Sequence, residues 1–417
     1  MRGAYFCCWR FCSEHISTTA QAQRYKNVFC NRIAKRRCKG FRCATKLLAT
    51  TRQTKAKHTG AFTMDCTQEF KHVAEGFQIA GEVISVLPYG NGHINRTLLV
   101  TTTQKRYILQ RINTKVFPDT DVLMNNIVMV TEHLQRQGIE TLRVVPTVDN
   151  KSYLKGEDCY RMYDFIEHSV TFQTADSLEV FAESGRAFGA FQNYLSAFDA
   201  SKLVEIIPHF HDTPKRFDDF CKALEQNASG RAHLCQKEID FVLARKDTFA
   251  QITNALQNGT LPLRVTHNDT KLNNVLLDAA THKARAVIDL DTIMPGSMLY
   301  DFGDSIRFGA STAAEDEQDL TKVHFSLQLF RAYAEGYLGQ VKNSVTPQEA
   351  LMMPVGAYMM TVECGMRFLA DYIQGDTYFA TKYPEHNLVR CRTQFKLVAE
   401  METQTEQMRK IIEEILN

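Results

Sequence analysis

Apolar positions in the first part of the chain fall in short runs that suit β-strands. The runs lie at 77–86, 97–102, 106–112, 143–148 and 159–167, with glycine-containing or polar turns between the first three. Residues 119–138 show helical spacing instead, with an aspartate or threonine available as the N-cap and Gly138 as the stop. This part is therefore predicted to form a small antiparallel sheet with one long helix.

Beyond a hinge near residues 164–169, the spacing of apolar positions becomes mostly helical. The predicted helices cover 175–198, 233–256, 315–338, 346–373 and about 390–416. Two further strand-like runs, 274–278 and 285–291, are joined by the polar turn AATHKA and predict a hairpin. The order of elements indicates an α+β protein with a sheet-rich first half and a mostly helical second half.

Charge divides the chain unevenly. Residues 1–63 hold fourteen Lys or Arg and a single acid, Glu14, whereas the remainder has 35 basic and 46 acidic residues, a net charge of −11. An acidic body is a poor nucleic-acid binder, because binding would need a basic face. We expect 1–63 to be a disordered extension or no part of the mature protein, with a transit peptide or a nucleic-acid-binding tail as alternatives. The body would then consist of an N-terminal lobe, 64–168, and a C-terminal lobe, 169–417.

Cysteine spacing and hydropathy limit the protein class further. Six of the twelve cysteines precede residue 44, the others are scattered, and no paired C-x-x-C motifs predict a zinc site. Scattered cysteines in an enzyme-sized chain suit a reducing compartment, so the expected location is cytoplasmic. No apolar run reaches the roughly 18 residues that a membrane helix needs, so no membrane association is expected.

The most specific chemical pattern lies in the loop that precedes the hairpin. Residues 267–274 read HNDTKLNN, a form of H-x-D-x-x-x-x-N, and Asp289 follows fifteen residues after Asn274. Asn274 begins one hairpin arm and Asp289 ends the other, so antiparallel pairing would bring both within reach of one cation. Oxygen ligands of this kind suit Mg²⁺, and in phosphoryl transfer a nearby aspartate accepts the proton of the substrate hydroxyl. The pattern predicts Mg²⁺ at Asn274 and Asp289, with Asp269 as the catalytic base.

The segment 288–304, IDLDTIMPGSMLYDFGD, contains four aspartates and allows other interpretations. Its tripeptide 301–303 spells the DFG of protein kinases, but it lies off the hairpin, so Asp289 remains the predicted metal ligand. IDLDT also resembles the D-x-D-x-T loop of haloacid-dehalogenase-like phosphatases, in which Asp289 would be the nucleophile and Asp291 the acid or base. The preceding hairpin does not suit that fold. A purely structural interpretation makes His267 a core histidine and the aspartates turn residues.

Over residues 75–400 the chain resembles the aminoglycoside phosphotransferase and choline kinase family, which has the bilobal protein-kinase-like fold. Within that family it is most similar to the N-acetylhexosamine 1-kinases. The stretches that carry the similarity are GNGHIN, LQRINTKVFPD, THNDTKLNNVL, VIDLDTIMPGSMLYDFGDSIRFGAST and ECGMRFLADYIQGD. The resemblance implies ATP, Mg²⁺ and a small sugar as ligands, with the anomeric hydroxyl of an N-acetylhexosamine as the acceptor. Choline, homoserine, methylthioribose and aminoglycosides are alternative acceptors for the same fold.

The resemblance also assigns roles around the nucleotide. Asp301 would brace the catalytic loop from below, and His267 would be structural. The stretch YGNGHINRT matches the glycine loop that covers the ATP phosphates, whose glycines let backbone N–H groups approach closely. The residues assigned to nucleotide binding are Gly90, Gly92, His93, Asn95, Gln110 and Arg111.

One departure from the family concerns the cation on the third strand. Kinases of this fold usually place a lysine or arginine there, whereas RYILQRI puts Gln110 in the matching register with Arg111 beside it. Neighbouring strand residues point to opposite faces, so only one of them can enter the site. Glu132 is a candidate for the helix glutamate that would pair with such a cation, and a solvated surface residue is the alternative. The missing lysine leaves open a nucleotide-binding protein without catalysis.

The acceptor is expected between the catalytic loop and the C-terminal helices. Thr292 directly follows residues 289–291, here called the metal loop, and Arg367 lies in a helical stripe with Glu363 and Asp371 at i, i+4 and i+8. The stripe is either a salt-bridge ladder or a set of donors for sugar oxygens. Phe308 and Tyr378 are candidates for packing against the sugar ring or its acetyl group, or are core aromatics.

Overall fold

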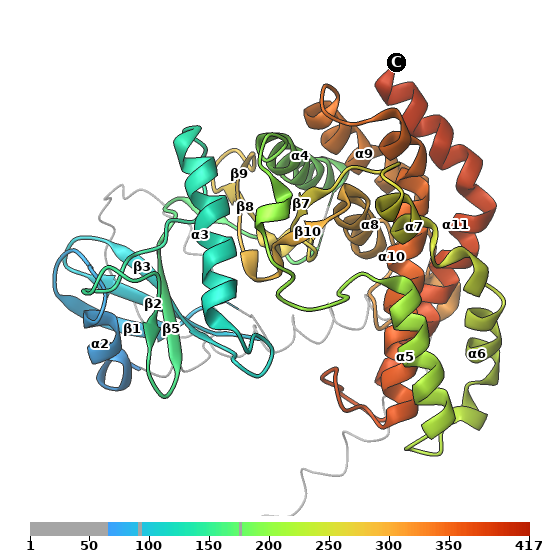
Figure 1. Cartoon of the computed structure of the whole chain (residues 1–417), viewed down its shortest axis with the longest axis horizontal. Coiled ribbons are helices and arrows are strands. Elements are labelled where there is room, and N and C mark those ends of the chain that lie inside the picture. The colour runs from blue at the N-terminus through green and yellow to red at the C-terminus, as the bar shows by residue number, and fades with distance from the viewer. Residues whose placement is uncertain (1–65, 91–93, 175–176) are drawn as a thin grey trace, which may run out of the picture. The chain divides into compact units, whose positions relative to one another are not determined.

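The computed structural model describes residues 66–90, 94–174 and 177–417, which all belong to one compact unit, Phe62–Asn417 (Figure 1). The basic extension predicted for 1–63 lies outside the described residues. An antiparallel sheet dominates the first part of the described chain, and helices dominate the second part. The α+β prediction is therefore confirmed, with the sheet on the N-terminal side as the apolar pattern indicated.

The N-terminal sheet is antiparallel throughout and has the strand order β1-β2-β3-β5-β4. Its register places Gln110 of β3 directly opposite Arg161 of β5. The predicted strand at 143–148 forms only isolated bridges, because Pro146 has no N–H for a ladder. The strands are β1 (Val83–Pro88), β2 (Arg96–Thr102), β3 (Arg106–Ile112), β4 (Leu154–Lys155) and β5 (Cys159–Asp164).

Two helices accompany this sheet. The short α2 (Thr67–Glu75) buries Phe70 and Val73 in the same hydrophobic cluster as the inner residues of β1, β2 and β3. The long α3 (Thr120–Arg136) is capped by Asp119, whose carboxylate accepts the Val122 N–H, as the predicted cap requires. Its apolar face joins the large core of the C-terminal part, so α3 connects the sheet to the helices.

The helical part confirms three of the five predicted helices and corrects two. Residues 233–256 divide at a 3-10 turn, and residues 315–326 precede the helix, because Ser326 caps it by accepting the Leu329 N–H. No helix in the described ranges is both long and apolar enough to span a bilayer. The helices are α4 (Leu178–Tyr194), α5 (Thr213–Gln226), α6 (Gln236–Leu243), α7 (Gln251–Gln257), α8 (Met298–Gly309), α9 (Leu327–Val341), α10 (Pro347–Gln374) and α11 (His386–Leu416).

Short strands hold the loop that carries the predicted catalytic residues. The predicted hairpin is confirmed: Val275 pairs with Val287 across its arms, and the Ile288 N–H donates to the Asn274 carbonyl at 2.9 Å. The loop 267–274 therefore runs between two small sheets. The strands involved are β6 (Ser169–Val170), β7 (Arg264–Thr266), β8 (Val275–Asp278), β9 (Ala284–Val287) and β10 (Met294–Gly296).

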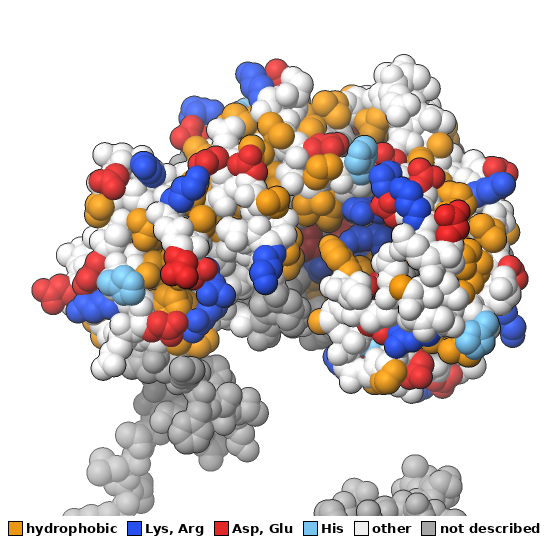
Figure 2. Space-filling view, turned by 60° about the horizontal axis from the view of Figure 1, so that its bottom comes forward, with side chains coloured by type: hydrophobic (Ala, Val, Ile, Leu, Met, Phe, Trp, Pro, Cys, Tyr) orange, Lys and Arg blue, Asp and Glu red, His pale blue; other side chains and the backbone are white. Residues whose placement is uncertain are grey.

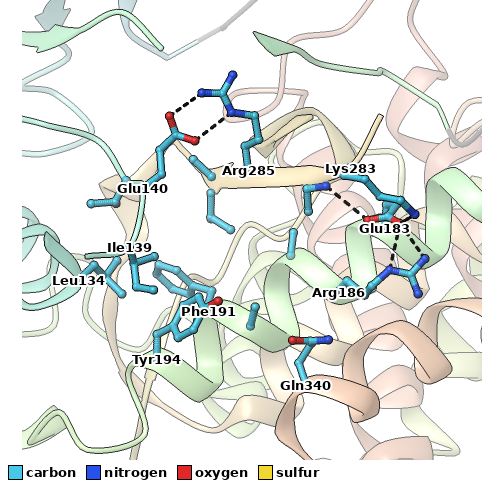
Figure 3. Close-up of a pocket in the computed structure, with 16 residues that line it drawn as sticks. Leu134, Ile139, Glu140, Glu183, Arg186, Phe191, Tyr194, Lys283, Arg285 and Gln340 are labelled. Carbon is cyan, nitrogen blue, oxygen red and sulfur yellow. Dashed lines mark hydrogen bonds and ion pairs between the residues drawn. The ribbon is translucent and has the colours of Figure 1, made fainter. Parts of the chain in front are cut away.

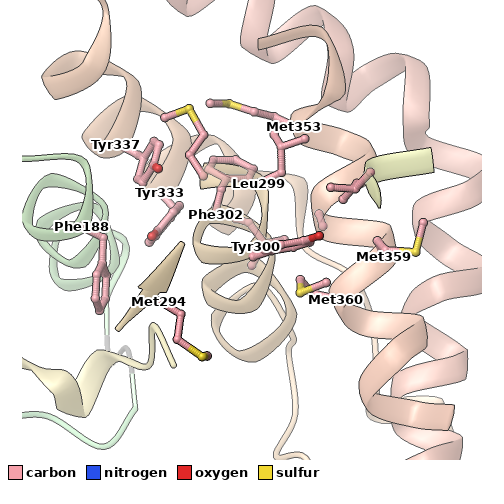
Figure 4. Packing of buried hydrophobic residues seen from close by; sticks show 14 of the residues in the cluster. Phe188, Met294, Leu299, Tyr300, Phe302, Tyr333, Tyr337, Met353, Met359 and Met360 are labelled. Atoms are coloured by element: carbon pink, nitrogen blue, oxygen red, sulfur yellow. The ribbon is translucent and has the colours of Figure 1, made fainter. Parts of the chain in front are cut away.

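Helix α8 is the centre of the helical core (Figure 4). Its Phe302 is fully buried, with ring centroids 5.6 Å from Tyr333 and 5.4 Å from Tyr337. The next residue, Gly303, lies so close to α10 that an added Cβ would be 2.3 Å from the Gly356 carbonyl oxygen. The literal DFG tripeptide thus lies within a buried helix, and its glycine is a packing contact.

The close approach of α8 and α10 predicts a stability change. Gly303→Ala should lower the free energy of unfolding by about 2–3 kcal/mol, since overpacking against backbone forces the two helices apart. Gly339→Ala in the exposed part of α9 is the matched control, because an added Cβ there meets nothing within 4 Å. That change should stabilise the protein by up to about 1 kcal/mol through helix propensity. Urea unfolding measures both, and equal stability of the two variants would contradict the packing account.

Candidate active site

His267 anchors the start of the catalytic loop inside the protein. Its Nδ1 accepts the Asp269 N–H at 3.3 Å, and its Nε2 donates to the Ile288 carbonyl at 2.9 Å. These two bonds require the neutral imidazole with the proton on Nε2. The ring thereby ties the loop to the strand that leads into Asp289, as expected of a structural histidine.

Asp301 and Asp304 hold the loop from below. The fully buried Asp301 carboxylate accepts the N–H groups of His267 at 3.0 Å and Asn268 at 2.8 Å. Asp304 accepts the Thr270 N–H at 3.0 Å and receives the Arg307 guanidinium at 2.9 Å. Both aspartates face the loop backbone, so the DFG aspartate has no free oxygen directed at a nucleotide.

The surroundings shift the pKa of these two carboxyl groups in opposite directions. Burial raises the pKa of Asp301 above its ordinary value, although the hydrogen bonds that its carboxylate accepts oppose the shift. For Asp304, burial acts in the same direction, but the charges of Arg307 and Lys271 outweigh it and lower the pKa. The Asp304–Arg307 pair is therefore a charged brace.

Asp269 is the exposed carboxylate of the loop. About 31% of its side chain is accessible, and its oxygens are held by Lys271 Nζ at 2.6 Å and Asn274 Nδ2 at 3.2 Å. The pKa of Lys271 is raised, because attraction by Asp269 and Asp304 exceeds the lowering effect of burial. Sequence analysis did not single out Lys271, although its place two residues after Asp269 was the available signal.

Asn274 and Asp289 meet at the end of the hairpin, as predicted. Asn274 uses its Nδ2 for the Asp269 carbonyl and carboxylate, so its Oδ1 is left without a donor among the described residues. No described residue forms a hydrogen bond or an ion pair with the Asp289 carboxylate, which opens toward the cleft. Crowding by protein and the negative charges of Asp291 and Asp269 raise the pKa of Asp289 to about 6. The free Asn274 oxygen, the free Asp289 carboxylate and the excess negative charge fit a divalent cation.

The donor set favours Mg²⁺ over metals that need a complete protein cage. No group of three or more His, Cys, Asp or Glu in the described residues is arranged to hold a metal ion. Mg²⁺ is commonly held by one or two protein oxygens, with waters and substrate phosphates completing the shell. Asn274 and Asp289 provide such a pair.

These residues open into a cleft between the N-terminal sheet and the hairpin. Its volume of about 280 Å³ is close to those of two other cavities, each about 240 Å³, so the lining rather than the size distinguishes it. Gly90, the hinge residues 164–166, Asn274 and Asp289 line this cleft. Figure 3 shows another cavity, lined by α4 and β9, whose charged residues already pair with each other, as Glu140 does with Arg285.

The structure separates the predicted nucleotide residues into three groups. Gly90 has φ +72°, a conformation that glycine adopts at little cost, and Gln110 lines the cleft. Among the described residues that line the cleft, neither Arg111 nor Asn95 appears. Arg111 points to the opposite face and pairs with Asp158, and Asn95 is buried with both side-chain groups bonded. The predicted Gly92 and His93 lie outside the described residues.

Glu132 was a wrong candidate, because it is an exposed residue paired with Arg136 one helical turn away. The cation that approaches Gln110 is Arg161, which sequence analysis missed. Its Nε donates to Gln110 Oε1 at 3.0 Å, and its Nη1 lies 2.5 Å from Asp291 Oδ1. The other Asp291 oxygen accepts Asn95 Nδ2, so Asp291 is engaged and unsuited to the phosphatase role considered above.

Thr292 was predicted to contact the acceptor, and the structure corrects that prediction. It is only 9% exposed, and its hydroxyl donates to the His267 carbonyl at 2.6 Å, so it braces the loop. Arg367 has no ion pair with any described residue, and its guanidinium lies 5.5–5.9 Å from the ring centroids of Phe210, Tyr378 and Phe379. Phe308 is half-buried and flanks Arg307.

The interpretation of the charged stripe on α10 as a salt-bridge ladder is likewise wrong. Glu363 accepts hydrogen bonds from His211 and Thr213, and Asp371 accepts the N–H groups of residues 377–379. Neither carboxylate pairs with Arg367. Asp371 instead fixes the segment that places Tyr378 beside that arginine.

The fold and this loop define a kinase-like phosphotransferase: a small sheet lobe, a helical lobe and an H-x-D-x-x-x-x-N loop facing Asp289. A model of the phosphotransferase enzyme family matches residues 85–337, well over half of the chain. The chain belongs to that family.

Solved structures support the same fold. A microcompartment-associated aminopropanol kinase aligns with a TM-score of 0.55 at 14% identity over 82% of this chain and 98% of that chain. A spectinomycin phosphotransferase in complex with ADP and spectinomycin gives 0.52 at 13% identity over 83% and 100%. A choline kinase from Cryptosporidium parvum gives 0.52 at 15% identity over 84% and 99%. At these identities the likeness establishes the fold, and the acceptor has to be argued from the site.

Proposed function

We propose that this protein is an ATP- and Mg²⁺-dependent kinase that phosphorylates a small sugar, at the anomeric hydroxyl of an N-acetylhexosamine. The observation that carries the proposal is the arrangement of three residues around one cleft. The Asp269 carboxylate is accessible, and Asn274 and Asp289 present oxygens that lack donors among the described residues. The family and the ADP-bound spectinomycin phosphotransferase support a nucleotide as the phosphoryl donor.

Each residue has a definite task in this reaction. Asp269 would orient the acceptor hydroxyl and take its proton as the oxygen attacks phosphorus. Lys271 and Asn274 keep that carboxylate in place through their contacts with its two oxygens. Bound Mg²⁺ would neutralise negative charge on the transferred phosphoryl group. Because little covalent chemistry falls to the protein, positioning and charge neutralisation account for most of the catalysis.

The surroundings of Arg367 support a sugar as the acceptor. Its guanidinium forms no ion pair with a carboxylate among the described residues and is framed by three aromatic rings, a setting that offers bidentate donors and flat apolar contacts to a sugar. A quaternary ammonium such as choline would be repelled by this cation, since such ligands favour acidic or purely aromatic walls. Figure 2 shows Lys and Arg side chains in a hollow on the drawn face, with acidic side chains beside them. The N-acetylhexosamine itself is inferred from the sequence resemblance.

An acceptor panel tests the proposal. The full chain with Mg·ATP should release ADP with N-acetylglucosamine or N-acetylgalactosamine and show no release above background with choline or kanamycin. Release with choline or kanamycin alone would contradict the sugar and retain the kinase. No release with any of the four would contradict this proposed function.

Arg367→Met should raise the KM for the N-acetylhexosamine about 10-fold or more and leave the KM for ATP unchanged. The reason is the loss of charged donors that would bind the acceptor and not the nucleotide. Arg331→Met is the matched control, because Arg331 is a half-exposed arginine of α9 paired with Glu414. Steady-state kinetics on both variants decide the matter: an unchanged acceptor KM in Arg367→Met would remove Arg367 from the site.

A further inference from the structure

The register of β3 and β5 raises the question of which residue replaces the strand cation. Gln110 occupies the position where kinases of this fold carry a lysine or arginine, and it cannot neutralise phosphate charge. Arg161 lies directly opposite it on the neighbouring strand, and its Nε donates to Gln110 Oε1 at 3.0 Å. The guanidinium therefore lies beside Gln110, on a side chain of β5 that is only 1% exposed.

The donors of Arg161 are only partly used. Nε forms the hydrogen bond to Gln110, whereas the contact between Nη1 and Asp291 is an ion pair without hydrogen-bond alignment. Nη2 donates no hydrogen bond to any described residue. Two residues further along the same face of β5, the Tyr163 hydroxyl is buried without a partner as well. Buried donors without acceptors cost free energy, so this corner is suited to an acceptor-rich ligand.

The charged residues of the cleft also favour phosphate binding beside Arg161. Of the described residues that line the cleft, Arg161 is the only Lys or Arg, and it shares the cleft with Asn274 and Asp289. A nucleoside triphosphate carries about four negative charges, which one divalent cation cannot neutralise. Guanidinium groups bind phosphate oxygens through paired N–H donors.

Asp291 fixes the direction of this guanidinium. It lies two residues after Asp289, faces Arg161 through Oδ1 and accepts Asn95 Nδ2 through Oδ2 at 2.5 Å. The ion pair thus links β5 and the start of β2 to the metal loop. In protein kinases a lysine on the third strand pairs with a helix glutamate, and here the exposed Glu132 of α3 takes no part.

We propose that Arg161, oriented by Asp291, is the cation that binds the phosphates of the nucleotide in this protein. The inference rests on the proposed function, because it requires ATP or ADP in the cleft. It differs from the usual arrangement in two ways: the cation comes from β5 in place of β3, and its acidic partner comes from the metal loop in place of α3. Nucleotide phosphates and the metal loop are thereby coupled through one ion pair.

Calorimetric titration of the full-length protein with Mg·ATP and, separately, with adenosine tests this inference. Arg161→Met should weaken Mg·ATP binding by about 10- to 100-fold, the range expected for lost charged hydrogen bonds, and leave adenosine binding within about 2-fold. Arg111→Met is the matched control, since this neighbouring arginine faces away from the cleft and pairs with Asp158. It should change neither affinity.

Removing Arg161 alone leaves the buried Asp291 carboxylate without its cation, which can impair folding. The double variant Arg161→Met/Asp291→Asn removes both charges and keeps an acceptor for Asn95. It should show the same selective loss of Mg·ATP affinity. Wild-type Mg·ATP affinity in this variant, or an equal loss of Mg·ATP and adenosine affinity, would overturn the role of Arg161. Absence of nucleotide binding by the wild-type protein would instead overturn the proposed function, and the inference with it.

Discussion

Asp269→Asn should lower kcat by about 10²- to 10⁴-fold, the contribution typical of a positioned general base. Asparagine keeps the size of the side chain and the contact with Asn274 but cannot accept the proton of the acceptor hydroxyl. The Kd for Mg·ATP should stay within about 3-fold of the wild-type value, because the metal oxygens of Asn274 and Asp289 are untouched. Steady-state kinetics and calorimetry on the same preparation separate the two effects.

Asp278→Asn is the matched control for that change. Asp278 lies on the same hairpin at the end remote from Asn274, where its carboxylate accepts N–H groups of the turn. Asparagine preserves those bonds, so turnover should be normal. Near-normal turnover of Asp269→Asn as well would show that another group takes the proton.

The second large effect is expected at the metal loop. Asp289→Asn should lower kcat/KM for ATP by about 10³-fold, because a bound metal contributes several kcal/mol of charge stabilisation. The carboxylate has no partner among the described residues, and its pKa is raised to about 6 by crowding and by the neighbouring charges of Asp291 and Asp269. Its ionised form is therefore unfavourable without a cation, and the neutral variant should be at least as stable as the wild type in metal-free buffer.

Two readouts check the Asp289 prediction apart from activity. Electron paramagnetic resonance of Mn²⁺ in the presence of ADP should show a clear loss of bound metal in Asp289→Asn. Thermal unfolding in metal-free buffer should show an unchanged or higher Tm. A variant that kept metal affinity, or that unfolded well below the wild type without metal, would show that Asp289 is structural.

The sequence predicted the parts of the site that local rules control. The turn between two β-rich runs determined the hairpin, and antiparallel pairing placed Asn274 and Asp289 together. Strand alternation correctly required that only one of Gln110 and Arg111 enter the cleft. These predictions involve residues that are close in sequence or joined by one turn.

The parts that failed depend on contacts between distant segments. Arg161 lies 51 residues after Gln110, and only the pairing of β3 with β5 makes them neighbours. Asp291 differs from Asp289 through its partners in the N-terminal sheet, which the local sequence does not reveal. Thr292 has an ordinary hydroxyl in sequence, and the backbone carbonyl that occupies it is apparent only in the folded loop.

The DFG tripeptide shows the same distinction. Its place beyond the hairpin was enough to reject Asp301 as the metal ligand. The sequence did not explain why all three residues are buried. The packing of α8 explains it, because the glycine lies directly against α10. A motif of three letters therefore had to be judged by the element that carries it.

The central claim is transfer of phosphate from ATP to an anomeric hydroxyl that Asp269 activates. The most direct measurement is ¹H and ³¹P NMR of the product formed by the full chain from Mg·ATP and N-acetylglucosamine or N-acetylgalactosamine. We predict a phosphorus coupling on the anomeric proton and no product with Asp269→Asn. Phosphorus coupled to a proton at any other ring position, or no phosphorylated sugar with either epimer, would contradict the claim.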